Sequence, residues 1–254
     1  MSVNIHPTAI VEDGAHICDN VTIGAYSYIG GMTTIGEETV IHHHATVSGK
    51  TTIGKGNIIH PYAYIGAPTH DLKYTGGDPE LKIGDYNVFR EYCTAHVATK
   101  DGNCTVIGNN NVFLAYSHIA HDCVIGNGIV VSSLSAVGGH VRVDDFVNIG
   151  WNVGVHQFCA IGKYAMVGAK SKVVRDVPPY MLSDGIPSIV RCPNFVNLKR
   201  HNFSQERITQ IKTIYKIFYM RGTNRSCAID AIKSENIDDD ILSEYTNFLS
   251  KTMR

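Results

Sequence analysis

An aliphatic or other apolar residue recurs at every sixth position through most of the first 174 residues. The series covers positions 5–65, returns over 83–95 and continues over 107–173, and many of its isoleucines are directly followed by glycine. A branched side chain every six residues, with small residues where the backbone turns, predicts short strands wound into a solenoid. Three strands would close one coil of about 18 residues. An ordinary β-sandwich would show alternating residues and irregular turns instead.

Two interruptions of this six-residue pattern predict loops that leave the solenoid, at about 67–82 and 98–105. Insertions of this kind often lie at the binding face of a repeat protein. The first contains Asp71, Lys73 and Tyr74, and the second closely follows His96.

The pattern changes after Val174, where two prolines in "RDVPPYM" predict the end of the coils. Helical spacing follows over 203–222, with Ser204 as the expected N-cap and Gly222 just past the end. Two further helices are predicted over 227–235 and 238–252. We therefore expect a β-helix domain at 1–178 and a helical domain at 179–254.

Composition narrows the class of protein. Hydrophobic residues make up 44% and charged residues 18% of the chain, which predicts a packed core rather than disorder. A net charge of −1, without a long run of one sign, argues against nucleic acid as the main partner. Seven cysteines without a CxxC pair predict reduced thiols. Neither a secretory signal nor the roughly 20 apolar residues of a membrane span occur, so we expect a cytoplasmic protein.

The stretch "AYSHIAHDCVIGNG" combines His118 and His121 with Asp122 and Cys123, which is compatible with a metal site or an acid–base site. The β-helix carbonic anhydrases bind zinc with a histidine pair five residues apart, a spacing that this chain lacks. The run His42–His44 is interpreted as a solvated corner, since successive strand residues point to opposite faces.

His140 follows His121 by 19 positions, close to one coil, so we expect the two on one wall of the solenoid. His156 would lie about one coil further. Stacked histidines suit acid–base chemistry near neutral pH, but stacked polar residues also simply solvate a face. The residues alone leave both readings open.

Seven motifs in order resemble the UDP-N-acetylglucosamine 3-O-acyltransferase family: "HPTAIVEDGA", "DLKY", "HIAHDC", "GHVRVDDF", "VHQFC", "DVPPY" and "LKR". The resemblance implies a left-handed parallel β-helix with a C-terminal helical appendage, assembled as a homotrimer with sites between neighbouring chains. It implies a 3-hydroxyacyl chain on acyl carrier protein as donor and the 3-hydroxyl of UDP-N-acetylglucosamine as acceptor. The reaction would be the first step of lipid A synthesis in a Gram-negative-type bacterium, without cofactor or metal.

By this resemblance His121 is the general base, Asp122 orients it, and the backbone N–H of Gly139 holds the oxyanion. Cys123 is then a packing residue rather than a nucleophile. The resemblance also implies substrate contacts at Asp71, Lys73, His96, His118, His140, His156, Gln157, Asn194, Arg200 and His201, and an acyl groove at Ala169.

Four positions depart from the family's pattern. His70 stands where glutamine is common, Arg191 is an added cation, Val196 replaces an acid seen in some members, and His201 stands where a second arginine is common. Two other functions therefore stay open: N-acylation of a 3-amino UDP-sugar, and a metal-binding or non-catalytic β-helix. Since a larger residue than glycine at Ala169 shortens the groove, we expect acyl chains of about fourteen carbons or fewer.

Overall fold

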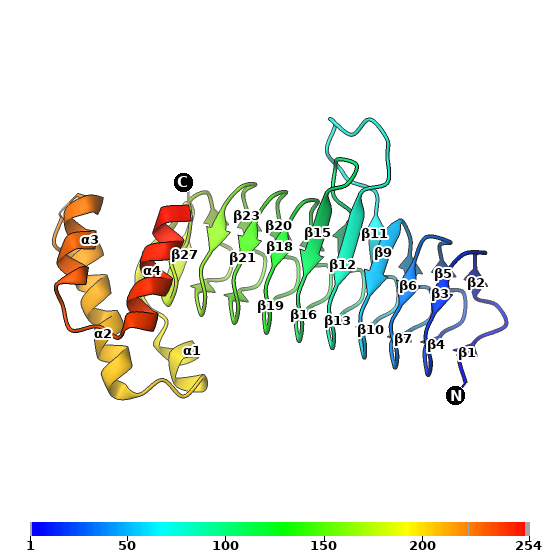
Figure 1. The fold of residues 1–254 in the computed structure, drawn as a ribbon, viewed down its shortest axis with the longest axis horizontal. Coiled ribbons are helices and arrows are strands. Elements are labelled where there is room, and N and C mark those ends of the chain that lie inside the picture. Colours follow the sequence, from blue (N-terminus) through cyan, green and yellow to red (C-terminus); the bar gives the residue numbers. More distant parts are fainter. Residues whose placement is uncertain (1, 223, 252–254) are drawn as a thin grey trace.

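The computed structural model describes residues 2–222 and 224–251. Short strands wind into a parallel β-helix whose cross-section is a triangle, and helices gather at its C-terminal end (Figure 1). Three sheets, called A, B and C here, form its three faces.

Sheet A joins the first strand of each coil to a final hairpin. Its strands are β1 Asn4–Ile5, β4 Thr22–Ile23, β7 Val40–Ile41, β10 Ile58–Ile59, β13 Val88–Phe89, β16 Val112–Phe113, β19 Val130–Val131, β22 Asn148–Ile149, β25 Met166–Val167, β27 Met181–Gly185 and β28 Ser188–Pro193. All its neighbours run parallel except β27 and β28.

Sheet B consists of β2 Ile10–Val11, β5 Tyr28–Ile29, β8 Thr46–Val47, β11 Tyr64–Ala67, β14 Thr94–His96, β17 His118–Ile119, β20 Ala136–Val137, β23 Gly154–Val155 and β26 Lys172–Val173. Sheet C consists of β3 His16–Ile17, β6 Thr34–Ile35, β9 Lys50–Ile53, β12 Glu80–Ile83, β15 Cys104–Ile107, β18 Val124–Ile125, β21 Arg142–Val143 and β24 Ala160–Ile161.

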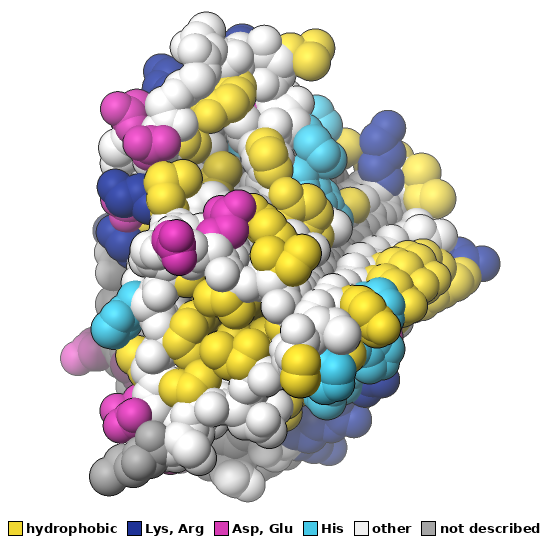
Figure 2. Space-filling model, turned by 90° about the vertical axis from the view of Figure 1, so that its right-hand side faces the viewer, with side chains coloured by type: hydrophobic (Ala, Val, Ile, Leu, Met, Phe, Trp, Pro, Cys, Tyr) yellow, Lys and Arg dark blue, Asp and Glu magenta, His cyan; other side chains and the backbone are white. Residues whose placement is uncertain are grey.

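The residues of the six-residue series form the core, because each points into the triangle and stacks on the residue one coil away. Ile23, Ile29 and Ile35 are at most 1% exposed, and the rings of Phe89 and Phe113 stack with centroids 4.8 Å apart. The first coil differs, because no coil covers its outer side. Ile5 is 42% exposed there, and hydrophobic side chains gather on this N-terminal end (Figure 2).

The two interruptions leave the same corner, between sheets B and C. Residues 68–79 follow β11, residues 97–103 follow β14, and the two loops project side by side (Figure 1). Strand pairs align residues 18 apart in an uninterrupted coil, as in Asn4 with Thr22. The spacing is 30 across the first loop and 24 across the second, after which the register resumes.

The C-terminal segment contains α1 Phe195–Arg200, α2 Gln205–Tyr215, a π-helical turn Lys216–Met220, α3 Arg225–Lys233 and α4 Asp239–Lys251. Ser204 caps α2 as predicted, since its side chain accepts the Arg207 N–H, and Gly222 has a φ of 65° past the helix end. The hairpin β27–β28 and helix α1 were not predicted. Because β27 extends sheet A beyond residue 178, the domain boundary stays a prediction.

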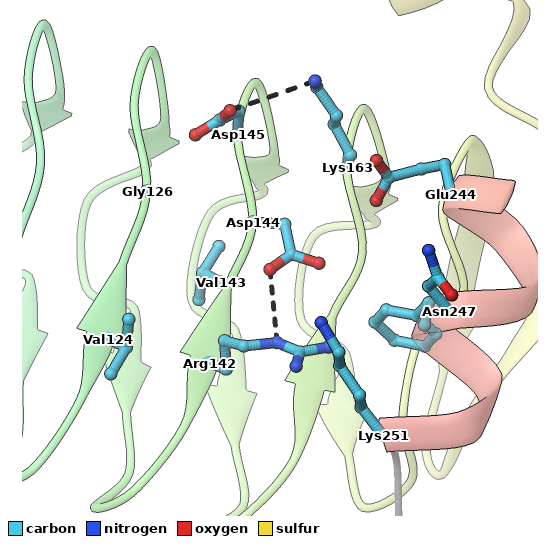
Figure 3. A pocket seen from close by; sticks show the side chains of 11 residues that line it. Val124, Gly126, Arg142, Val143, Asp144, Asp145, Lys163, Glu244, Asn247 and Lys251 are labelled. Atoms are coloured by element: carbon cyan, nitrogen blue, oxygen red, sulfur yellow. Dashed lines mark ion pairs between the residues drawn. The ribbon is translucent and has the colours of Figure 1, made fainter. Parts of the chain in front are cut away.

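Helix α4 packs against sheet C and encloses a polar pocket with it (Figure 3). Arg142 pairs with Asp144 at 3.2 Å and lies over the ring of Phe248, 5.4 Å from its centroid. None of the predicted site residues lines this pocket.

Candidate active site

The coil register decides which predicted residues meet at the corner between sheets B and C. One coil corresponds to 18 residues, so Gly139 lies directly over His121, and His140 lies over Asp122. The His140 N–H accordingly donates to the His121 carbonyl at 3.1 Å. His121 and His140 are neighbours as expected, with ring centroids 5.3 Å apart, although they are diagonal rather than stacked.

His156 does not continue this arrangement. The ring that stacks on His140 is Phe158, with centroids 4.6 Å apart. His156 is exposed, one coil beyond Gly138, and its Nδ1 lies 3.0 Å from the Gln157 carbonyl oxygen. The expectation of a ladder through His121, His140 and His156 was wrong, because spacings of 19 and 16 shift the side chain around the corner.

His121 is held at one nitrogen and is nearly buried, with 9% of its surface exposed. Its Nδ1 lies 2.9 Å from Asp122 Oδ2 and 2.9 Å from Thr99 Oγ1. Both partners therefore occupy the same side of the ring. This leaves Nε2 as the nitrogen that can accept a proton from a bound molecule.

Asp122 is fixed from several directions at a backbone φ of 58°. Its N–H donates to Thr105 Oγ1 at 2.8 Å, and its carboxylate accepts the Thr99 N–H at 3.0 Å and an Asn103 N–H at 3.3 Å. Burial raises the pKa of Asp122, but hydrogen bonds from His121 and Thr99 outweigh it and leave the pKa below its usual value. The carboxylate therefore stays charged beside His121.

Gly139 is required by the position of the His121 ring. A Cβ at this position would lie 2.5 Å from His121 Cε1 and 2.6 Å from Nε2, closer than side-chain contacts allow. Among the described residues, no hydrogen-bond acceptor engages the Gly139 N–H. This amide is thus available beside the imidazole, as the resemblance requires of an oxyanion donor.

The first external loop closes over the same corner. Thr69 Oγ1 and Thr99 Oγ1 are 2.9 Å apart, which links the loop to His121. Asp71 is half-buried and accepts the N–H of Lys73 at Oδ1, whereas the Lys73 side chain is exposed. Both predicted residues therefore lie on the loop that covers the histidines.

His96 and His118 lie beneath this loop, with ring centroids 4.8 Å apart. Burial lowers the pKa of His96 to about 3 and that of His118 to about 4, and neighbouring histidines lower both further. His118 Nδ1 also shares a hydrogen bond of 2.8 Å with Thr94 Oγ1. Both rings are neutral at physiological pH.

Cys123 is fully buried beneath this corner, and burial raises the pKa of its thiol to about 12. Its Sγ donates to the Gly138 carbonyl at 3.1 Å. A protonated thiol without exposure is a packing residue rather than a nucleophile, as predicted.

The other predicted site residues lie elsewhere on the chain. Ala169 is exposed at the corner between sheets A and B, one coil beyond Trp151. Asn194 and Arg200 line a pocket on sheet A together with Val196, and Asn194 also caps α1. His201 packs against the aromatic rings at the corner between sheets C and A.

Sequence reasoning missed the threonines that complete the site. Thr94, Thr99 and Thr105 bind His118, His121 and Asp122 respectively. Threonine is common on β-strands and carries no spacing signal of its own. Only the return of the register after each loop would have indicated that these residues meet the histidines.

The comparisons with known proteins agree with this geometry. The model described as "Udp N-acetylglucosamine O-acyltransferase; Domain 2" matches residues 176–254, and the bacterial transferase hexapeptide model matches residues 32–67. An acyl-[acyl-carrier-protein]–UDP-N-acetylglucosamine O-acyltransferase of Thiobacillus denitrificans is 39% identical, covering 98% of this chain and 97% of the relative. One from Verminephrobacter eiseniae is 43% identical, covering 90% and 88%.

Among solved structures, the UDP-N-acetylglucosamine acyltransferase of Francisella novicida superposes with a TM-score of 0.95 at 37% identity. It covers 98% of this chain and 92% of that one. The corresponding enzyme of Bacteroides fragilis also gives 0.95, at 34% identity and 98% coverage of both chains. The predicted fold class is confirmed: a left-handed parallel β-helix with a C-terminal helical appendage.

We predict that His96 and His118 stay neutral where a free imidazole is largely protonated. Their folded pKa values of about 3 and about 4 lie below the unfolded value near 6.5. Stability from these groups is therefore complete above about pH 6.5 and is lost as the pH falls toward the folded values. An NMR titration of metal-free protein should show neutral rings at pH 5.5, whereas the same histidines in urea-unfolded chain titrate near 6.5. Protonation of both rings in the folded protein by pH 5.5 would contradict this.

Proposed function

This chain belongs to the UDP-N-acetylglucosamine O-acyltransferase family, and from that premise we propose that it transfers an acyl chain from acyl carrier protein to UDP-N-acetylglucosamine. One observation supports this most directly: a nearly buried imidazole, His121, is fixed at Nδ1 by Asp122 and Thr99 and keeps Nε2 for a substrate proton. The curated relatives carry this activity in their names.

The proposed step forms an ester and releases the carrier thiol. The 3-hydroxyl of the sugar attacks the thioester carbonyl of a 3-hydroxyacyl chain while His121 Nε2 takes the hydroxyl proton. The tetrahedral intermediate then collapses, the carbon–sulfur bond breaks, and the imidazolium returns its proton to the leaving thiolate. Asp122 stabilises the imidazolium formed between these events, since its carboxylate lies 2.9 Å from Nδ1.

The Gly139 N–H is the proposed donor to the developing oxyanion. It lies one coil above His121, so a carbonyl oxygen held there would place the reacting carbon beside the imidazole. A backbone donor that is fixed before the reaction needs no reorganisation as charge develops, and removal of such a donor costs roughly 2.7–4 kcal/mol.

The proposed site is shared between chains of a homotrimer. His121 lies at the corner between sheets B and C, whereas the pocket of Asn194 and Arg200 lies on sheet A of the same chain. A single triangular prism cannot present both to one ligand. Packing prisms side by side lets the nucleotide pocket of one chain face the histidine corner of its neighbour, and Arg200 suits a phosphate there.

The remaining residues fit into this scheme as follows. His118 and His140, with Asp71, would contact the sugar, and Lys73 with His96 would flank the acyl carbonyl. His156 and Gln157 are exposed on the next coil, beside the groove that leads away from His121. His201 is engaged with Phe146 and Tyr164, so its proposed phosphate contact is the weakest of the set.

We place the reaction at the start of lipid A synthesis, in the cytoplasm. No helix within residues 2–222 and 224–251 is long and apolar enough to cross a membrane.

We predict that His121→Ala lowers kcat by roughly 10²–10⁴-fold, because the variant lacks the base. The assay follows acyl transfer to UDP-N-acetylglucosamine and, separately, to its 3-amino analogue. His16→Ala, exposed on β3, is the control for loss of a histidine. Unchanged turnover in His121→Ala would refute the base assignment, and faster turnover with the amino analogue would favour N-acylation.

We also predict a preference for acyl chains of about fourteen carbons or fewer, because the Ala169 methyl narrows the groove. Carriers loaded with ten to sixteen carbons give the profile, and Ala169→Gly should shift it toward longer chains. Ala25→Gly changes the same corner position near the N-terminal end and should leave the profile in place. Strongest activity of the unmodified chain at sixteen carbons would contradict the prediction.

A further inference from the structure

Three imidazoles meet beneath the first external loop. His70 comes from the loop, His96 from the end of β14 and His118 from β17. Ring centroids are 4.1 Å apart for His70 and His96, 4.8 Å for His96 and His118, and 5.8 Å for His70 and His118. One nitrogen from each ring lies within 4.8 Å of the others.

His96 has an unsatisfied nitrogen in this cluster. Its side chain is 2% exposed, and among the described residues its Nδ1 has no hydrogen-bond partner. A buried polar atom without a partner costs about 1–3 kcal/mol unless a water or ion engages it. The unsatisfied nitrogen faces a cluster of nitrogen donors, which is the environment of a metal ligand.

His118 is already oriented in the manner of a ligand. Its Nδ1 shares a hydrogen bond with Thr94 Oγ1, which fixes the ring and leaves Nε2 as the second donor atom. Metal-binding histidines commonly have this kind of oxygen partner at the other ring nitrogen. Burial of His96 and His118 also favours the neutral imidazole that coordinates metals.

We propose that His70, His96 and His118 form a binding site for a divalent transition metal of the zinc type. Three neutral imidazoles and one water make a common tetrahedral Zn²⁺ site, with ligand nitrogens about 3.4 Å apart. The observed separations of up to 4.8 Å require the rings to approach by about an ångström. The exposed His70, on its loop, is the ligand placed to move.

The second histidine cluster, His121, Asp122 and His140, has equally close donor atoms but is a poorer site. Asp122 Oδ2 already accepts the Thr99 N–H and lies 2.9 Å from His121 Nδ1, and its other oxygen accepts from Asn103. A metal there would have to displace these bonds. At His70, His96 and His118, by contrast, a metal would satisfy a nitrogen that lacks a partner.

Equilibrium dialysis of the full chain against Zn²⁺ tests the site. We expect one Zn²⁺ per chain in the unmodified protein and at least about 100-fold weaker binding in His70→Gln. His70 is exposed, so this variant should fold, and an unchanged thermal midpoint in the absence of zinc confirms that it does. His118→Gln should weaken binding similarly, whereas Mg²⁺, which prefers oxygen ligands, should not bind.

His140→Gln is the matched control, because it removes a histidine from the second cluster only. Unchanged zinc affinity in His140→Gln, with loss in His70→Gln, supports the assignment. Loss in His140→Gln with retention in His70→Gln would move the metal to His121 and Asp122. No zinc bound to the unmodified chain at 100 µM, an arbitrary ceiling of about that size, would overturn the proposal.

A second readout rests on the proposed function. Zinc at His118 would occupy the acceptor side of the site, so it should inhibit acyl transfer by the unmodified chain. For each protein the rate with zinc is divided by its own rate without zinc, and this ratio should return toward one in His70→Gln. Dialysis measures binding without any substrate, so a failure of the acyl-transfer proposal is distinguished from a failure of the metal site.

Discussion

The register of one coil upon the next is the constraint on which the rest of this structure depends. An inward apolar side chain at every sixth residue fixes where each strand begins, and 18 residues bring the chain back to the same place. A shift of one residue would turn every core side chain outward. The two loops respect this rule, since the coils on either side of each loop pair in the same alignment.

The site follows from that register more than from any single motif. Stacking places Gly139 over His121 and His140 over Asp122, while the loops bring Thr69 and Thr99 to the same corner. The result is a carboxylate held charged by its hydrogen bonds, an imidazole with one free nitrogen and an unengaged amide beside it. Each group is on or next to a paired strand, which is how a repeat scaffold positions reacting groups rigidly.

Much of this could be predicted from the sequence, because the six-residue pattern has no competing interpretation and adjacent residues such as His121 and Asp122 stay adjacent in space. The rest depended on register across the loops. A spacing of 19 suggested stacking of His121 and His140, but a one-residue offset made Phe158 the partner of His140. Thr99 and His70 lie in the interruptions, where no periodicity predicts position. Helix α1 and the β27–β28 hairpin are too short for a clear pattern.

The central claim is that coil stacking positions the base, and the close contact between Gly139 and His121 tests it most directly. Measurement of kcat for Gly139→Ala and Gly154→Ala compares a glycine whose Cβ would lie 2.5 Å from the imidazole with one whose Cβ would meet nothing within 4 Å. The account predicts a loss of roughly 100-fold or more for Gly139→Ala and little change for Gly154→Ala, at similar thermal midpoints. Equal kcat values for the two variants would contradict it.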